Sequence, residues 1–166
     1  MSAARVLRWP VALLVSAALI ALPIPAVASS GAAVRGGGVV DGPPGLTSQL
    51  GFTATSAGGS FLCVMAGRSG GFPFSPWQSV QQMRVEGKVT PGSLNISNGI
   101  ATFHGVATIH VIGTTASGEF SVTLTDVPFI STQTSGGAGV ASHVLNVPGV
   151  GVFAGSLKSG HITIWP

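Results

Sequence analysis

The sequence contains very little charge. Its 166 residues include seven lysines and arginines and four acidic residues. Arg5 and Arg8 lie in an N-terminal segment that we expect to be removed, which leaves a nearly neutral chain with scattered basic residues. Such a distribution forms no basic patch, so we expect no nucleic acid partner. The surface should consist mainly of Ser, Thr, Gly and Gln.

Cysteine is also nearly absent, since Cys63 is the only one. A single cysteine excludes an internal disulfide and leaves either a buried thiol or a bridge between two chains. Its apolar neighbours, residues 61–65, favour the buried thiol. Cys63 also lies too far from the N-terminus to carry a lipid anchor there.

The common motifs of metal and nucleophile sites are missing. The sequence has no H-x-H, H-E-x-x-H, C-x-x-C or G-x-S-x-G spacing. His104 and His110 would lie about 20 Å apart along one strand, too far to bind one ion. We therefore predict no catalytic residue, no metal site and no cofactor. The histidines are expected at the surface or at strand edges.

The four carboxylates remain as candidates for hydrolytic chemistry. A secreted hydrolase with an unrecognised site is one alternative function, and Glu119, Asp126 and His161 are the residues that would test it. Asp126 precedes Val127 and Pro128, a position at which an aspartate commonly bonds turn backbone. We therefore expect Asp126 to close a strand.

The first 28 residues have the three parts of a secretory signal peptide. Arg5 and Arg8 form a basic start, residues 11–22 are an almost unbroken apolar run, and residues 26–28 supply the small-x-small pattern of a cleavage site. The apolar run is shorter than the about 20 residues of a membrane span. We predict a signal peptide over 1–28, a flexible Gly/Ala/Ser lead over 29–38 and one all-β domain over 39–166. The mature protein would be secreted and would have no membrane span.

Alternating apolar and polar residues dominate the rest of the chain. The clearest stretch is Asn98 to Asp126, which predicts two long strands joined by a polar turn at residues 113–118. In the first strand Ala101, Phe103, Ala107, Ile109 and Val111 share one parity. Further strands are expected at 50–54, 61–66, 83–89, 140–145, 150–154 and 161–165.

No stretch after residue 28 has the periodicity of an amphipathic helix. Glycine and proline recur where strands should end. We therefore predict an all-β fold, a single antiparallel β-sandwich or small β-barrel of about 8–10 strands.

The least regular stretch of the domain is residues 67–76. Its glycines and prolines exclude a regular element, yet Phe72, Phe74 and the following Trp77 are apolar. These aromatics either cover one end of the core or form an exposed patch. Because exposed aromatic clusters usually mark contacts, they are the predicted contact surface.

Several segments resemble a family of small secreted bacterial β-proteins. The family has an F-G-F segment, a T-F-x-G-x-A-T strand, an F-x-V-x-V-x-D strand and a terminal G-G-N-I-x-I. The corresponding segments here are residues 50–54, 101–108, 120–126 and 159–164. The resemblance implies an all-β fold but no activity, since the family has no assigned function. The chain departs from the family in its apolar residues 127–129 and in its unpaired Cys63.

The complete strand pattern without a converging ionisable cluster predicts a non-catalytic domain that acts by surface contact at or outside the cell envelope. The main alternative is a small barrel that binds or isomerises an apolar small molecule. A pocket would support that alternative, and a filled interior would count against it. The expected lining residues of such a pocket are Phe52, Phe61, Met83, Phe103 and Phe120.

Overall fold

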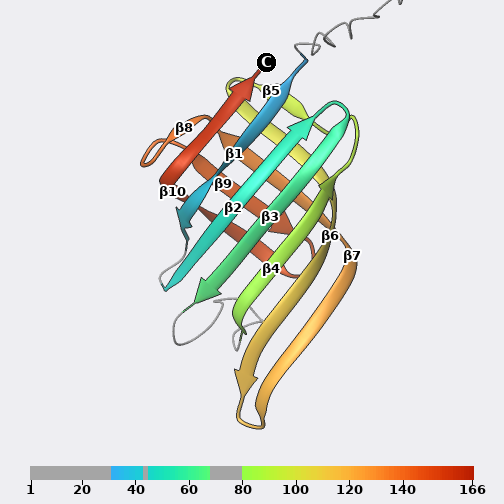
Figure 1. The fold of residues 1–166 in the computed structure, drawn as a ribbon, viewed down its shortest axis with the longest axis vertical. Coiled ribbons are helices and arrows are strands. Elements are labelled where there is room, and N and C mark those ends of the chain that lie inside the picture. The colour runs from blue at the N-terminus through green and yellow to red at the C-terminus, as the bar shows by residue number, and fades with distance from the viewer. Residues whose placement is uncertain (1–30, 43–44, 68–79) are drawn as a thin grey trace, which may run out of the picture.

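The computed structural model describes residues 31–42, 45–67 and 80–166 (Figure 1). The signal peptide prediction and the contact residues Phe72, Phe74 and Trp77 lie outside the described residues. Within them the chain forms ten strands and no helix. The strands are β1 (Ala33–Asp41), β2 (Leu46–Thr55), β3 (Gly58–Gly67), β4 (Val80–Val89), β5 (Asn95–Ser97), β6 (Ile100–Thr115), β7 (Gly118–Thr134), β8 (Gly136–Gly137), β9 (Ser142–Val147) and β10 (Gly151–Trp165).

The strands form one antiparallel sheet that closes into an eight-stranded barrel. Its order is β1-β2-β3-β4-β6-β7-β9-β10, and pairing of β1 with β10 completes the ring. The short strands β5 and β8 pair with β6 and β10 outside this ring. The all-β antiparallel prediction is therefore confirmed, and the closing β1–β10 pair decides for the barrel over the sandwich.

The prediction of a flexible lead over residues 29–38 is wrong from residue 33 onward. Residues 33–38 belong to β1, whose Gly36–Gly38 segment lies between β2 and β10. A Cβ atom at Gly38 would lie 1.9 Å from the Ser159 carbonyl oxygen, and one at Gly36 would lie 2.8 Å from that of His161. These glycines allow the β10 backbone to approach closely. A glycine-rich segment can therefore be part of a paired strand, although its composition alone suggests flexibility.

The C-terminal strand differs from its prediction in a similar way. The expected strands at 150–154 and 161–165 are one continuous strand, β10. Gly160, with φ of 101°, lies inside it opposite Gly38. Its missing Cβ leaves room for the β1 backbone, since a Cβ there would lie 2.1 Å from the Gly37 carbonyl oxygen.

Alternating residues of each strand fill the barrel. On β6 the predicted parity is confirmed, because Ala101, Phe103, Ala107, Ile109 and Val111 are all buried. Phe129 of β7 is buried over two glycines on neighbouring strands. A Cβ at Gly87 would lie 2.5 Å from the Phe129 ring, and one at Gly105 would lie 2.9 Å from it. The core therefore depends on small residues placed opposite large ones.

Strand β7 does not end at Asp126, contrary to the prediction. Ala107 pairs with Val127 and Ile109 with Leu124, so two residues of β7 stand opposite Thr108. Asp126 adopts φ of 55° in this bulge. Because a bulge adds one residue to one strand, it reverses which parity faces inward. Leu124 and Val127 consequently pack on the same core.

One part of the β6–β7 hairpin extends beyond the barrel. Figure 1 shows the two strands curving past the ends of the other strands. β7 pairs with β9 only through Ile130–Gln133. Among the described strands, none pairs with the outer edge of residues 118–129.

Candidate functional site

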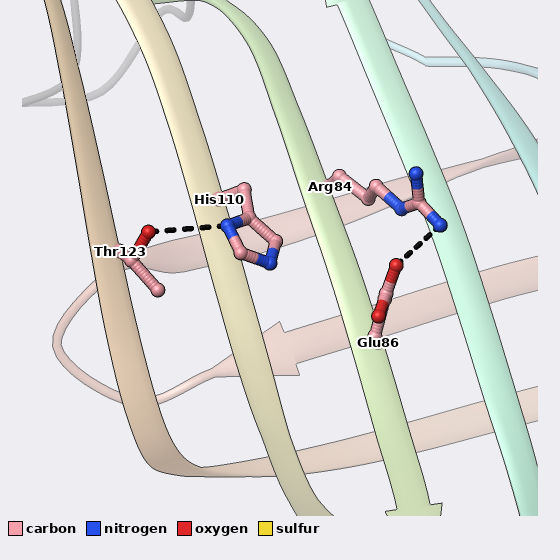
Figure 2. A network of polar contacts seen from close by, with 4 residues as sticks. All are labelled: Arg84, Glu86, His110 and Thr123. Atoms are coloured by element: carbon pink, nitrogen blue, oxygen red, sulfur yellow. Dashed lines mark hydrogen bonds and ion pairs between the residues drawn. The ribbon is translucent and has the colours of Figure 1, made fainter.

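A row of polar side chains crosses the outer face of β4, β6 and β7. Arg84 on β4 pairs with His110 on β6, which pairs with Thr123 on β7. Directly opposed residues of neighbouring antiparallel strands project from the same face. Figure 2 shows these side chains together with Glu86, two residues along β4 from Arg84.

Two polar contacts organise this row. His110 Nδ1 lies 3.1 Å from Thr123 Oγ1, within hydrogen-bonding distance. The Arg84 guanidinium forms an ion pair with the Glu86 carboxylate, and the two side chains are 51% and 43% exposed. An exposed ion pair of this kind contributes only about 0–1 kcal/mol to stability. The charged groups are therefore accessible to a partner.

The row lines a shallow groove of about 380 Å³. Its lining residues are Gln82, Arg84, Glu86, His110, Ile112 and Ser121. A second hollow of about 480 Å³ shares Arg84 and Glu86 and adds Leu62, Lys88 and Thr108. Together they offer guanidinium, ammonium and amide donors, carboxylate and hydroxyl acceptors, and two partly exposed aliphatic side chains. Such a surface suits hydrogen bonding to a polar partner more than covalent chemistry.

The interior of the barrel is filled with aromatic rings. The ring centres of Phe61 and Phe129 are 5.0 Å apart, those of Phe52 and Phe103 are 5.7 Å apart, and Phe103 meets Phe129 edge to face. Among the residues expected to line a pocket, Phe52, Phe61, Phe103 and Met83 are buried in this packing, whereas Phe120 lies half-buried on the projecting hairpin.

A small hollow lies beside Met65 and Met83. Its volume is about 10 Å³, and Leu145, Val147, Val150, Gly151 and Phe153 complete its lining. A cavity of this size holds at most about one water molecule. It is too small for the apolar ligand of the alternative function.

A polar cluster is nevertheless buried inside the barrel. Gln133 Nε2 lies 2.7 Å from Ser131 Oγ and 2.8 Å from His143 Nδ1, and all three residues are fully buried. The imidazole also stacks on Phe61 with ring centres 6.0 Å apart. Burial lowers the pKa of His143 to about 4, so the ring is neutral at pH 7. With Nδ1 accepting from Gln133, the proton lies on Nε2.

His143 corrects the prediction that the histidines lie at the surface or at strand edges. His104, His110 and His161 are exposed as predicted, but His143 points into the core from β9. Its alternation with Leu145 and Val147 was visible in the sequence. Its hydrogen-bonding partners Gln133 and Ser131 were not, because the strand that carries them was expected to end at Asp126 and instead continues to Thr134.

The other candidate residues do not converge on a site. Cys63 is buried as predicted, and burial raises the pKa of its thiol to about 12. Glu119, Asp126 and His161 are exposed at the tip of the hairpin, in the β7 bulge and on β10. Within the described residues, no group of three His, Cys, Asp or Glu side chains is placed to hold a metal ion.

The polar row itself was missed at the level of sequence. In the sequence Arg84 is one of the scattered basic residues, Glu86 is one of the four carboxylates, and His110 is expected only at the surface or at a strand edge. Only the register between β4 and β6 brings Arg84 opposite His110. Strand alternation gives the face of a residue but not its neighbour across the sheet.

Comparison with known proteins gives no relative from which a role could be transferred. No family model, no curated protein and no solved structure matches the chain. The resemblance to the small secreted β-proteins therefore stays a prediction. In the part of the chain that the structure describes, no helix is long and apolar enough to cross a membrane.

Proposed function

We propose that this protein is a secreted, non-catalytic β-barrel domain that binds a polar partner at or outside the cell envelope, through the groove over β4, β6 and β7. One observation carries the proposal. The barrel interior is filled by phenylalanines, while Arg84, Glu86 and His110 project together from the outer face.

The character of the groove indicates the chemistry of the partner. It places positive, negative and neutral hydrogen-bonding groups close together, with Ile112 as a 45% exposed apolar neighbour. A strongly charged polymer would meet like charge somewhere in this groove. A surface rich in hydroxyl and amide groups, as on a polysaccharide or an extended peptide, would find both donors and acceptors.

Binding to envelope material tests this proposal. Purified protein would be incubated with isolated cell envelopes of its host, and the bound fraction measured by sedimentation. We expect Arg84→Ala combined with His110→Ala to weaken retention by at least about tenfold, equivalent to about 1.4 kcal/mol. Lys158→Ala, which removes an exposed cation from β10, is the control and should bind normally. Equal retention of all three proteins, or no retention of the wild type, would refute the groove as the contact site.

Export is tested separately by the mass of the protein recovered from culture medium. The signal peptide prediction requires a chain that begins at Ser29. An unprocessed chain retained in the cell would contradict secretion. Native mass spectrometry of the same sample addresses the alternative function, since an apolar molecule copurifying at fixed stoichiometry would support an internal ligand.

A further inference from the structure

The outer edge of β7 is an open strand edge, and we propose that it pairs with the same edge of a second copy of this chain. The open part is Gly118–Leu124, which pairs with β6 on one side and with none of the described strands on the other. An edge strand presents unpaired N–H and C=O groups at alternate residues, and these form a template for another strand.

The protective features of this edge begin only after Leu124. The bulge at Thr125 and Asp126 interrupts the ladder, and Pro128, which has no N–H, follows it. Bulges and prolines are the usual means of blocking an edge, as are lysines. Residues 118–124 contain no lysine, arginine or proline. The sequence therefore blocks the edge near the barrel and leaves it open on the projecting hairpin.

The open segment is complementary to itself in antiparallel orientation. With Ser121 opposite Ser121 of the second copy, Glu119 faces Thr123 and Phe120 faces Val122. No two carboxylates are opposed in this register, whereas a parallel arrangement would set Glu119 against Glu119. An antiparallel pair also satisfies the twofold symmetry of most homodimers.

The same register also places apolar residues of the two copies opposite each other on the inner face of the hairpin. Val122 is 38% exposed and Phe120 is half-buried on the inner face. Paired aromatic and β-branched residues stabilise a strand pair, and this arrangement supplies two such pairs. A different partner protein would need its own strand with a matching pattern of residues. A second copy of this chain already carries that pattern in residues 118–124.

Pairing would also extend the polar row of the outer face. The cross-strand order Arg84, His110, Thr123 would continue to Glu119 of the second copy, which adds a carboxylate beside the groove. The dimer itself does not rest on the proposed function. Assembly and envelope binding are measured separately, so each proposal can fail alone.

Sedimentation velocity over a range of protein concentrations tests the pairing. The wild-type protein is expected to form dimers, and Val122→Lys should raise the dimer dissociation constant at least about tenfold, because it places an ammonium group against Phe120 of the second copy. Val122 lies on the face opposite the groove, so the binding residues are unchanged. Val152→Lys is the matched control, since Val152 is 54% exposed on β10 and lies away from this edge.

Chemical cross-linking tests the proposed register of the two β7 strands. Cys63 is buried, so Ser121→Cys adds an accessible thiol that should be linked between two chains by a short thiol-specific cross-linker. Ser60→Cys is the control, because Ser60 is exposed on β3, which is paired on both sides. A wild-type protein that stays monomeric up to its solubility limit would overturn the proposal. So would a dimer that survives Val122→Lys and is not linked through Ser121→Cys.

Discussion

At the scale of the residue, the buried His143 has the clearest consequence. Its imidazole hydrogen-bonds Gln133 and stacks on Phe61, while its Nε2 atom has no hydrogen-bonding partner among the described residues. A protonated ring here would have to be desolvated with no carboxylate to pair with it, which is why burial depresses its pKa.

Acid should therefore destabilise the protein through this residue. The unfolded chain protonates His143 near pH 6.5, whereas the folded chain does so only near pH 4. Between these values the unfolded state binds more protons, so stability falls as the pH is lowered, by about 3 kcal/mol in total. Urea unfolding of the wild type and of His143→Gln at pH 7 and pH 4.5 measures the difference. An identical pH dependence in both proteins would show that His143 does not titrate in this window.

Gly87 is a second residue whose role is set by its neighbours. Gly87→Ala places a methyl group 2.5 Å from the Phe129 ring, so we expect a loss of about 1–3 kcal/mol from overpacking. In a Phe129→Leu background the further loss should be smaller, because the ring is gone. Gly51→Ala is the control, since a Cβ there meets no atom within 4 Å. Equal costs at Gly87 and Gly51 in urea unfolding would contradict this packing.

At the scale of the element, the bulge in β7 controls which residues enter the core. Before it Phe120 and Leu124 face inward, and after it Phe129 and Gln133 do. Before Asp126 the alternation of apolar and polar residues gives the faces correctly. After it the alternation fails, because the polar Ser131 and Gln133 are buried whereas the apolar Ile130 is 41% exposed. The Val127–Pro128 pair looks like the end of a strand because proline donates no hydrogen bond. At a strand edge that bond is not needed.

Substitutions at Asp126 test the bulge. Its φ of 55° is tolerated by glycine and by aspartate but strained for β-branched residues. Asp126→Gly should leave stability unchanged or slightly higher, whereas Asp126→Val should lower it by about 1–3 kcal/mol. Thr125→Val, at the neighbouring exposed position, serves as the control. A well-tolerated Asp126→Val in thermal unfolding would mean that the backbone conformation at Asp126 is not required.

At the scale of the whole molecule, the fold depends on the contact between the two ends of the described chain. β1 and β10 pair over nine residues of β1, from Ala33 to Asp41. This long-range pairing closes the barrel and removes two edges that would otherwise be exposed. Gly36, Gly38 and Gly160 permit it by their small size.

A side chain in this seam should disrupt the entire barrel. Gly38→Ala would place its Cβ 1.9 Å from the Ser159 carbonyl oxygen at φ of 154°, so β1 and β10 could not keep their spacing. We expect a loss of about 3 kcal/mol or more, with all strands unfolding in one transition. Hydrogen exchange of β1, β3 and β6 amides measures whether the loss is shared. Loss of protection confined to β1 would show that the ring is not cooperative.

The sequence by itself determined the all-β class, the central hairpin, the inward parity of β6 and the burial of Cys63. These follow from local alternation and composition, since neighbouring residues of a strand point to opposite faces. Tertiary structure alone decided that the sheet closes, that Arg84 stands opposite His110 and that Gln133 reaches His143. Each of these depends on pairing between strands distant in the chain, and register is set by packing of the whole barrel rather than by any one segment. Gly36 and Gly38 of β1 are the clearest example. Glycine is required at these positions because the β10 backbone lies so close, and the sequence does not show that contact.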